Sequence, residues 1–215
     1  MKLSKRKKIT TFIVVLIGIF IAINFTFIWD NIKFTFWPPK VNAPVVVDTS
    51  LNSASATPAQ SNSVKNSITA NMKASTLVVP SLGIHVPIVY ATEVNEESFQ
   101  KALINGVAHY PDTANAGELG NVYIFGHSSD YITSKGNYKH VFSLLPRVKI
   151  GAEIFITDKN GNKFIYTVYN SRKVAADDVS VLSQQDYKKK LLTLQTSYPI
   201  GTALARWVVV AEIKN

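Results

Sequence analysis

The chain has 215 residues, 47% hydrophobic and 17% charged, a balance typical of one folded domain of ordinary size with an apolar appendage. The absence of cysteine excludes disulfides and thiolate metal sites. The net charge of +9 is concentrated in residues 1–74, which carry nine basic and two acidic side chains against fourteen and twelve in residues 75–215, and this distribution argues against nucleic acid as a partner.

The first segment is an apolar run behind a basic N-terminus. Residues 9–29 contain only four polar side chains, and as a helix they would span roughly 31 Å, about one hydrocarbon thickness. Five Lys and Arg residues in positions 1–8 favour a cytoplasmic N-terminus. We therefore expect a single-pass signal anchor in the cell membrane, with the C-terminal domain extracellular. A cleaved signal peptide is the alternative, although no small-residue cleavage site follows the run.

Residues 30–74 have the composition of a linker. The stretch from Asp48 to Ser67 is rich in Ser, Asn, Ala and Thr, lacks aromatic residues and shows no amphipathic period. We expect an extracytoplasmic linker here, and an ordered arm packed on the domain is the alternative.

Residues 75–215 form the predicted folded domain. Short runs rich in β-branched and aromatic residues predict strands over 76–79, 85–89, 121–126, 153–157, 163–170, 191–196 and 206–213. Short helices are predicted over 97–104 and 139–145. Asn160 and Gly161 are typical of a hairpin turn that needs positive φ angles. Many short strands with few helices indicate an all-β barrel or sandwich.

The most informative motif is the segment from Thr193 to Arg206, which reads T-L-Q-T-S-Y-P-I-G-T-A-L-A-R. Its first four residues are predicted to end a strand, residues 198–201 to form a turn, and Arg206 to begin the next strand. The pattern therefore places Ser197 at the end of one strand and Arg206 at the start of its neighbour.

This motif resembles the sortase family, whose pattern is T-L-x-T-C-x-P-x-G-x-x-x-x-R. Further blocks follow the order seen in sortases, so that the resemblance covers nearly all of residues 77–213; they are residues 106–111, 117–121, 125–128, 141–145 and 149–153. Ala152 stands where the family usually has Asp, and Ser197 where it has its nucleophilic cysteine.

The resemblance implies an eight-stranded β-barrel with a substrate groove near the ends of strands four and seven. It also implies a membrane-anchored transpeptidase that attaches surface proteins to the cell wall or to pili. In such enzymes the cysteine attacks the threonyl carbonyl of a sorting signal such as L-P-x-T-G. An amine of the cell wall or of a pilin then resolves the acyl-enzyme, so sorting-signal peptides and that amine are the expected partners.

The same resemblance assigns catalytic roles to three residues. His127 matches the catalytic histidine, as acid to the leaving amine and base for the incoming one, and Arg206 matches the arginine that holds the substrate carbonyl and stabilises the oxyanion. Ser197 takes the nucleophile position. Thr196 is expected to orient substrate, with an ordinary strand residue as the equal alternative. A turn-capping histidine and a solvated edge arginine are the plain structural alternatives for His127 and Arg206.

No cofactor is expected. The four histidines lack metal-ligand spacing, and His109 and Asn121 are expected to be structural. Asp177 and Asp178 are candidates for a calcium site, as in some sortases, although a solvated acidic loop is the simpler interpretation.

Serine changes the expected chemistry. A thiol with a pKa of about 8.5 ionises beside a histidinium, whereas a hydroxyl needs a base in contact during attack. Three explanations stay open for Ser197: an engineered replacement of cysteine, a natural inactive relative, or a working Ser–His variant. From a different class, the alternative is a non-catalytic surface barrel that binds an extended peptide.

Overall fold

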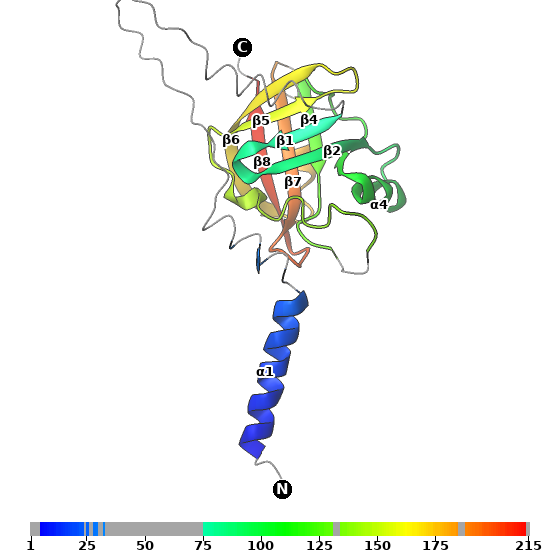
Figure 1. The fold of residues 1–215 in the computed structure, drawn as a ribbon. Helices are drawn as coiled ribbons and strands as arrows, with labels where there is room; N and C mark the ends of the chain where they lie inside the picture. Colours follow the sequence, from blue (N-terminus) through cyan, green and yellow to red (C-terminus); the bar gives the residue numbers. More distant parts are fainter. Residues whose placement is uncertain are drawn as a thin grey trace, which may run out of the picture.

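The strands after residue 75 close into a single barrel (Figure 1). The computed structural model describes residues 5–23, 25, 28, 29, 32, 75–130, 134–184 and 188–213. The barrel order is β1-β2-β3-β4-β7-β8-β6-β5, and β5 pairs back onto β1. The strands are β1 (Thr76–Val79), β2 (Ile84–Tyr90), β3 (Val107–His109), β4 (Gly120–Phe125), β5 (Glu153–Thr157), β6 (Lys163–Ala175), β7 (Lys190–Tyr198) and β8 (Ala205–Glu212). The predicted eight-stranded all-β barrel is confirmed.

The interior of the barrel is filled by every second residue of its strands. Val122 and Ile124 of β4 lie in the core with Leu192 and Leu194 of β7, and each is at most 1% exposed. Because successive side chains of a strand point to opposite faces, the residues between them face outward. The inward set supplies the main hydrophobic burial, and the outward set is left for other contacts.

The pairing of β4, β7 and β8 places one end of each strand at the same edge of the barrel. β4 and β7 are parallel and in register from Gly120 opposite Lys190 to Phe125 opposite Gln195. β8 runs antiparallel to β7, with Ser197 opposite Arg206. The C-terminal ends of β4 and β7 and the start of β8 therefore lie side by side.

Two short helical segments flank the outer face of these strands. Helix α4 (Glu96–Asn105) is capped at its N-terminus by Asn95, whose side chain accepts a hydrogen bond from the Ser98 N–H at 2.8 Å. It buries Ala102 and Leu103 in a small cluster with Ala108 beside the barrel (Figure 1). The 3₁₀ helix η3 (Val179–Leu182) lies between β6 and β7 and is capped by Asp178.

Two further 3₁₀ turns, η1 (Pro80–Leu82) and η2 (Leu145–Arg147), complete the described elements. The prediction of a helix over residues 139–145 is wrong. Successive hydrogen bonds there span three residues, as from Ser143 N–H to the His140 carbonyl at 3.0 Å, and they lead into η2 instead of an α-helix. Pro146 lacks an N–H donor, so an α-helix could not continue through it with all its hydrogen bonds.

Other local predictions also needed correction. The short strand β3 was not predicted as a strand, because three residues give too short an apolar pattern. In the hairpin between β5 and β6, Gly161 has φ +84° but Asn160 is not in the positive region. The Asp158 carboxylate instead accepts hydrogen bonds from the Asn160 and Asn162 N–H groups, both at 2.8 Å. The turn thus depends on one aspartate and one glycine.

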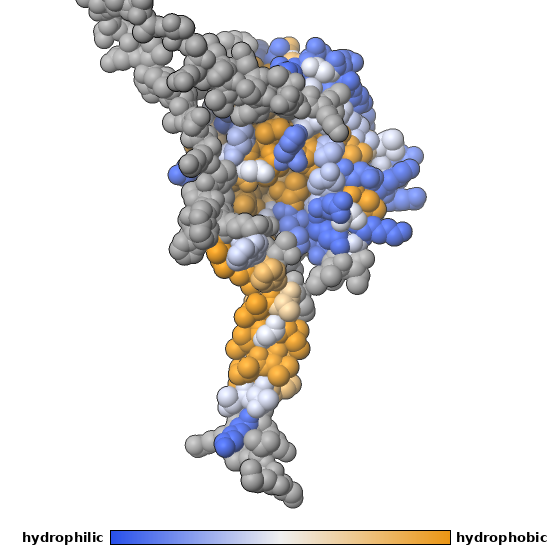
Figure 2. Space-filling view, in the orientation of Figure 1, coloured by the Kyte–Doolittle hydropathy of each residue, from blue (hydrophilic) through white to orange (hydrophobic). Residues whose placement is uncertain are grey.

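The N-terminal region contains helix α1 (Lys5–Ile23). Figure 2 shows hydrophobic side chains over most of its surface and hydrophilic ones near its N-terminal end. Within the described part of the chain, no helix combines the length and the apolar character needed to cross a membrane. The predicted membrane-spanning segment of residues 9–29 is therefore not confirmed. The predicted linker of residues 30–74 lies outside the described residues, apart from Ile32.

Candidate active site on the outer face of the barrel

The outward-facing residues of β4, β7 and β8 form the floor of a groove. On β4, Tyr123 and Phe125 alternate with the core residues. On β7, Gln195 and Ser197 follow the core residue Leu194 and face outward into the groove. The groove encloses about 560 Å³, and its walls are α4 on one side and the segment containing η3 on the other. The same alternation that builds the core therefore also builds the groove.

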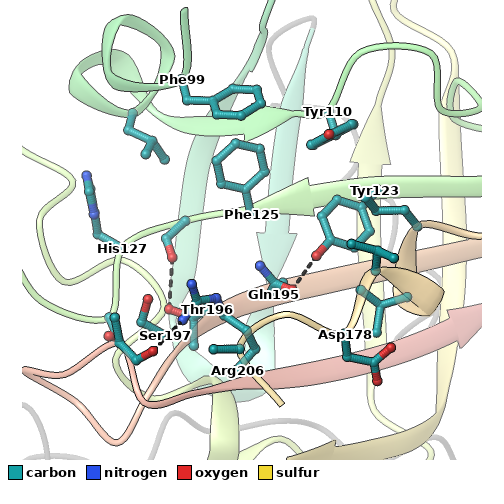
Figure 3. Close-up of a pocket in the computed structure, with 18 of the residues that line it drawn as sticks. Phe99, Tyr110, Tyr123, Phe125, His127, Asp178, Gln195, Thr196, Ser197 and Arg206 are labelled. Carbon is teal, nitrogen blue, oxygen red and sulfur yellow. Dashed lines mark hydrogen bonds between the residues drawn. The ribbon is translucent and has the colours of Figure 1, made fainter. Parts of the chain in front are cut away.

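The three predicted catalytic residues lie at one end of this groove. Ser197 and Arg206 are direct cross-strand partners, and Thr196 follows Gln195, which pairs with Phe125 of β4. His127 comes two residues after Phe125, at the same edge. His127, Ser197 and Arg206 all line the groove, and we call these three predicted catalytic residues the catalytic row (Figure 3). Their placement results from the register of β4, β7 and β8.

Aromatic side chains cover the floor away from the catalytic row. Phe125 lies edge-on to Phe99 of α4, with ring centroids 5.1 Å apart. Tyr110 contacts the rings of Phe99 and Tyr123 at 5.5 and 5.8 Å. These contacts join α4 to the barrel and give the groove a rigid apolar lining, since aromatic pairs of this geometry are mutually stabilising.

Three hydrogen bonds position the backbone of His127. The Gly126 N–H donates to the Gln195 carbonyl at 3.1 Å, and the Thr196 hydroxyl donates to the Gly126 carbonyl at 2.8 Å. The Phe142 N–H donates to the His127 carbonyl at 2.9 Å. Gly126, the residue before His127, is thus attached directly to the part of β7 that carries Ser197.

Gly126 allows this close packing. A Cβ atom at this position would lie 2.8 Å from the Phe142 ring and 3.0 Å from Val107. Any other residue would therefore displace the segment that leads into His127.

The imidazole of His127 is turned toward Asp130. Its Nε2 lies 3.7 Å from Asp130 Oδ2, and the two side chains are 19% and 17% exposed. The Ser134 hydroxyl donates to the other carboxylate oxygen at 2.8 Å. Figure 3 shows the ring directed away from Ser197 and Arg206. In this conformation the imidazole contacts a carboxylate and not the hydroxyl at the nucleophile position.

The environment of His127 favours its neutral form. Burial lowers the pKa of His127 below its usual value, and the charge of His140 lowers it further, while Asp130 and Glu96 act in the opposite direction. A neutral imidazole can accept a proton, so the group is suited to act as a base once it contacts its partner.

Ser197 and Arg206 both have side-chain atoms that make no hydrogen bond within the described part of the chain. Within the described residues, the Ser197 hydroxyl makes no hydrogen bond. One terminal nitrogen of Arg206 donates to the carbonyls of Ala203 and Ala205, both at 3.1 Å. These bonds hold the guanidinium near the turn and leave its other N–H groups for a ligand.

Thr196 lines the groove, and its predicted role in orienting substrate stays a prediction. It is 2% exposed, and its hydroxyl is used by the Gly126 carbonyl. We interpret Thr196 as a residue that positions His127. Asn121 and His109 have the structural contacts expected of them: the Asn121 amide donates to the Val181 carbonyl at 3.0 Å, and His109 Nε2 lies 3.0 Å from the Ala114 carbonyl oxygen.

The predicted calcium candidates lie on the rim of the groove. Asp178 accepts hydrogen bonds from the backbone N–H and the hydroxyl of Ser180, which accounts for its lowered pKa. In the part of the chain that the structure describes, no group of three or more His, Asp or Glu residues is arranged to hold a metal ion.

The sequence did not point to the pair formed by Tyr123 and Gln195. The Tyr123 hydroxyl donates to Gln195 Oε1 in the middle of the groove floor (Figure 3). The period-two alternation along β4 and β7 was the available signal, because it places both residues on the face that carries Ser197.

Comparison with known proteins identifies the family of the folded domain. Residues 77–214 match the Sortase domain. Sortase D of Bacillus subtilis (strain 168) is 26% identical over 139 residues, a match that covers 63% of this chain and 61% of that protein. The chain thus spans less than two thirds of this relative.

Solved structures agree in fold. A Sortase D5 transpeptidase from Clostridium perfringens has a TM-score of 0.54 at 24% identity, covering 72% of this chain and 89% of that one. Sortase A from Corynebacterium diphtheriae has a TM-score of 0.53 at 25% identity, covering 65% and 60%. Because the family match extends over more than half of its length, the chain belongs to the sortase family.

Proposed function

We propose that the groove binds a sorting signal of the L-P-x-T-G type, and that the catalytic row is the site of acyl transfer to an amine of the cell wall or of a pilin. The observation that carries the proposal is the register that brings His127, Ser197 and Arg206 to one end of the groove. An extended peptide fits an open groove whose floor consists of strands.

Each residue of the row has a chemical role in this proposal. Arg206 always carries charge, and its free N–H groups bind the threonyl carbonyl and stabilise the oxyanion that forms on attack. His127 accepts the proton that the nucleophile loses on attack and donates it to the leaving amine; it then accepts a proton from the incoming amine and returns it to the nucleophile. The nucleophile forms the acyl bond to threonine as the Thr–Gly bond breaks.

Ser197 limits the rate of this reaction. A hydroxyl does not ionise near neutral pH, so attack requires a base in hydrogen-bond contact. His127 is turned toward Asp130, and the Ser197 hydroxyl has no hydrogen-bond partner among the described residues. We therefore expect the groove to bind peptide while the acyl-transfer rate stays low.

This arrangement also supports a second candidate function, a non-catalytic barrel that recognises sorting signals. The observation that favours it is the same separation of base and hydroxyl. The two functions share the groove and differ only in whether a covalent acyl-serine forms.

The Ser197→Cys variant separates the two. Full-length wild type and variant are incubated with an L-P-x-T-G peptide and an amine, and product is measured by mass spectrometry. We expect the cysteine form to make product at least about 100-fold faster, because a thiol of ordinary pKa of about 8.5 ionises far more readily than a hydroxyl. Tight binding by both forms with no product from either supports the binding barrel. Neither binding nor product from either form contradicts both functions.

We further propose that residues 1–29 hold the protein at the cell membrane with the barrel outside. The support is the sequence alone: the basic residues 1–8 and the apolar run that follows. Fractionation of cells, followed by protease treatment of intact cells, tests this placement. Full recovery of the chain in the soluble fraction would contradict it.

A further inference from the structure

Gln195 is a polar residue of the groove floor whose neighbours on the adjacent strands are apolar. It lies two residues before Ser197 on the same face of β7, and its cross-strand neighbours are Phe125 on β4 and Val208 on β8. A polar group among such neighbours is costly unless it is hydrogen-bonded. Gln195 is half-buried, so the end of its amide that faces the protein needs a partner, while an end that faces the groove can meet water or a ligand.

One end of this amide is occupied. The Tyr123 hydroxyl donates to Oε1, and Tyr123 is itself only 3% exposed, packed with Val174, Val181 and Val208. Burial raises the pKa of Tyr123 well above its usual value, so the phenol stays protonated and remains a donor. The orientation of the Gln195 amide is thus set by a rigid neighbour.

The other end of the amide is open to the groove. Nε2 carries two N–H donors, and within the described residues neither has a protein acceptor. Nε2 is also not among the buried polar atoms that lack a partner, so it is accessible from the groove. Figure 3 shows it pointing away from the Tyr123 hydroxyl. The floor therefore presents a fixed hydrogen-bond donor.

The position of this donor matches a particular residue of an extended peptide. Alternate residues of a strand are about 6.6 Å apart, so Gln195 lies about that far from the catalytic row. If the peptide runs along β7 with its threonyl carbonyl at that row and its N-terminal part over Gln195, it advances about 3.3 Å per residue. Gln195 is then level with the second residue before the threonine, and its amide is within side-chain reach of the residue that directly precedes the threonine, which is offset by about 3.3 Å.

We propose that Gln195, oriented by Tyr123, binds the residue that directly precedes the threonine of the sorting signal by donating a hydrogen bond to an oxygen acceptor on it. The inference rests on the proposed function of the groove. The acceptor is an amide-type oxygen, which either a Gln-like side chain or the main-chain carbonyl supplies.

The test measures binding of labelled L-P-Q-T-G and L-P-M-T-G peptides to the full-length Ser197 protein by fluorescence anisotropy. Methionine resembles glutamine in shape but lacks the amide oxygen. One hydrogen bond corresponds to roughly a three- to tenfold change in affinity. We expect the wild type to prefer the glutamine peptide by this factor if the side chain is the acceptor, and the preference to disappear in Gln195→Met. If the main-chain carbonyl is the acceptor, Gln195→Met weakens both peptides by this factor.

Two further variants make the test independent of a packing change. Gln195→Glu keeps an oxygen for the Tyr123 hydroxyl but replaces the donor by an acceptor, so it should weaken binding at least as much as Gln195→Met. Tyr123→Phe should weaken binding less, because it only frees the amide to rotate. Tyr169→Phe, on β6 outside the groove lining, is the control for removal of a tyrosine hydroxyl and should bind as the wild type does.

Wild-type affinity for both peptides in both Gln195 variants would overturn the inference and leave the proposed function intact. If the wild type itself binds neither peptide, the proposed function fails and the inference fails with it.

Discussion

The inner and outer faces of β4 and β7 make different kinds of contact. On the inner face, Ile124 and Leu194 are fully buried among aliphatic side chains. On the outer face, Tyr123 and Gln195 form a hydrogen bond, and Ser197 opens onto a groove. One strand therefore supplies stability through alternate residues and chemistry through the residues between them.

The comparison teaches that the two properties can be changed separately. Core residues act through volume and apolar area, which any strand of the barrel supplies. Outer residues act through the position of single polar atoms, which depends on the register with neighbouring strands. Thr196 connects the two, because it is buried like a core residue but holds the segment that precedes His127.

The largest expected effect lies on the outer face, at Arg206. In a Ser197→Cys background, Arg206→Ala should lower the acyl-transfer rate roughly 100- to 1,000-fold, because a donor to the oxyanion is lost. Arg206→Lys keeps the charge but not the planar set of donors and should lie in between. The measurement is kcat/KM with an L-P-x-T-G peptide. A rate unchanged in Arg206→Ala would show that the arginine serves only the turn at Ala203.

The inner face should show the opposite response at Leu194. Leu194→Ala should lower the free energy of unfolding by about 3 kcal/mol, because it removes buried methyl groups and leaves a cavity. Leu194→Met, which conserves volume, should cost less than about 1.5 kcal/mol. Urea denaturation measures both. Peptide affinity of the folded Leu194→Ala protein should match the wild type, and a loss of affinity at unchanged stability would contradict the separation of faces.

Thr196 tests the connection between the faces. Thr196→Val retains the shape but leaves the Gly126 carbonyl without its donor, which should cost about 1–2 kcal/mol of stability and displace His127. Thr196→Ser retains the hydroxyl and is the matched control. Stability comes from urea denaturation, and the position of His127 from its imidazole NMR shifts. Equal stability of the two variants would show that the hydroxyl is dispensable.

The smallest expected effect is a shift of the His127 pKa. Asp130→Asn should lower the pKa further, since the carboxylate raises it, and His140→Gln should raise it, since that charge lowers it. Imidazole NMR titration measures both, with Glu96 left in place. If the His127 pKa moved in the same direction in both variants, Asp130 and His140 would not have opposite effects on it.

The lowered pKa of His127 also predicts how the stability of the protein changes with pH. The pKa of His127 is lowered from its unfolded value of 6.5, so its contribution is full above pH 6.5 and is lost as the pH falls through the folded value. Unfolding measured in steps of pH below 6.5 tests this trend against a His127→Gln variant, which should show a weaker dependence.

Much of the fold was predictable because its signals are local. The strands β1 and β5 were predicted at their observed bounds, and α4 to within one residue at each end, because runs of β-branched residues and short helical stretches are local patterns. Strand β3 and the turns after His140 escaped prediction. Their structure depends on pairing with β2 and β4 and on the bond from Phe142 to the His127 carbonyl.

The sequence by itself determined the order of short strands, the alternation of core residues and the motif that ends at Arg206, because each depends on residues close in the chain. Only the tertiary structure decided that the His127 imidazole contacts Asp130, that the Thr196 hydroxyl donates to a backbone carbonyl, and that Tyr123 orients the amide of Gln195. These contacts join atoms from different strands and loops. Their geometry follows from strand register and side-chain rotation, which no local pattern encodes.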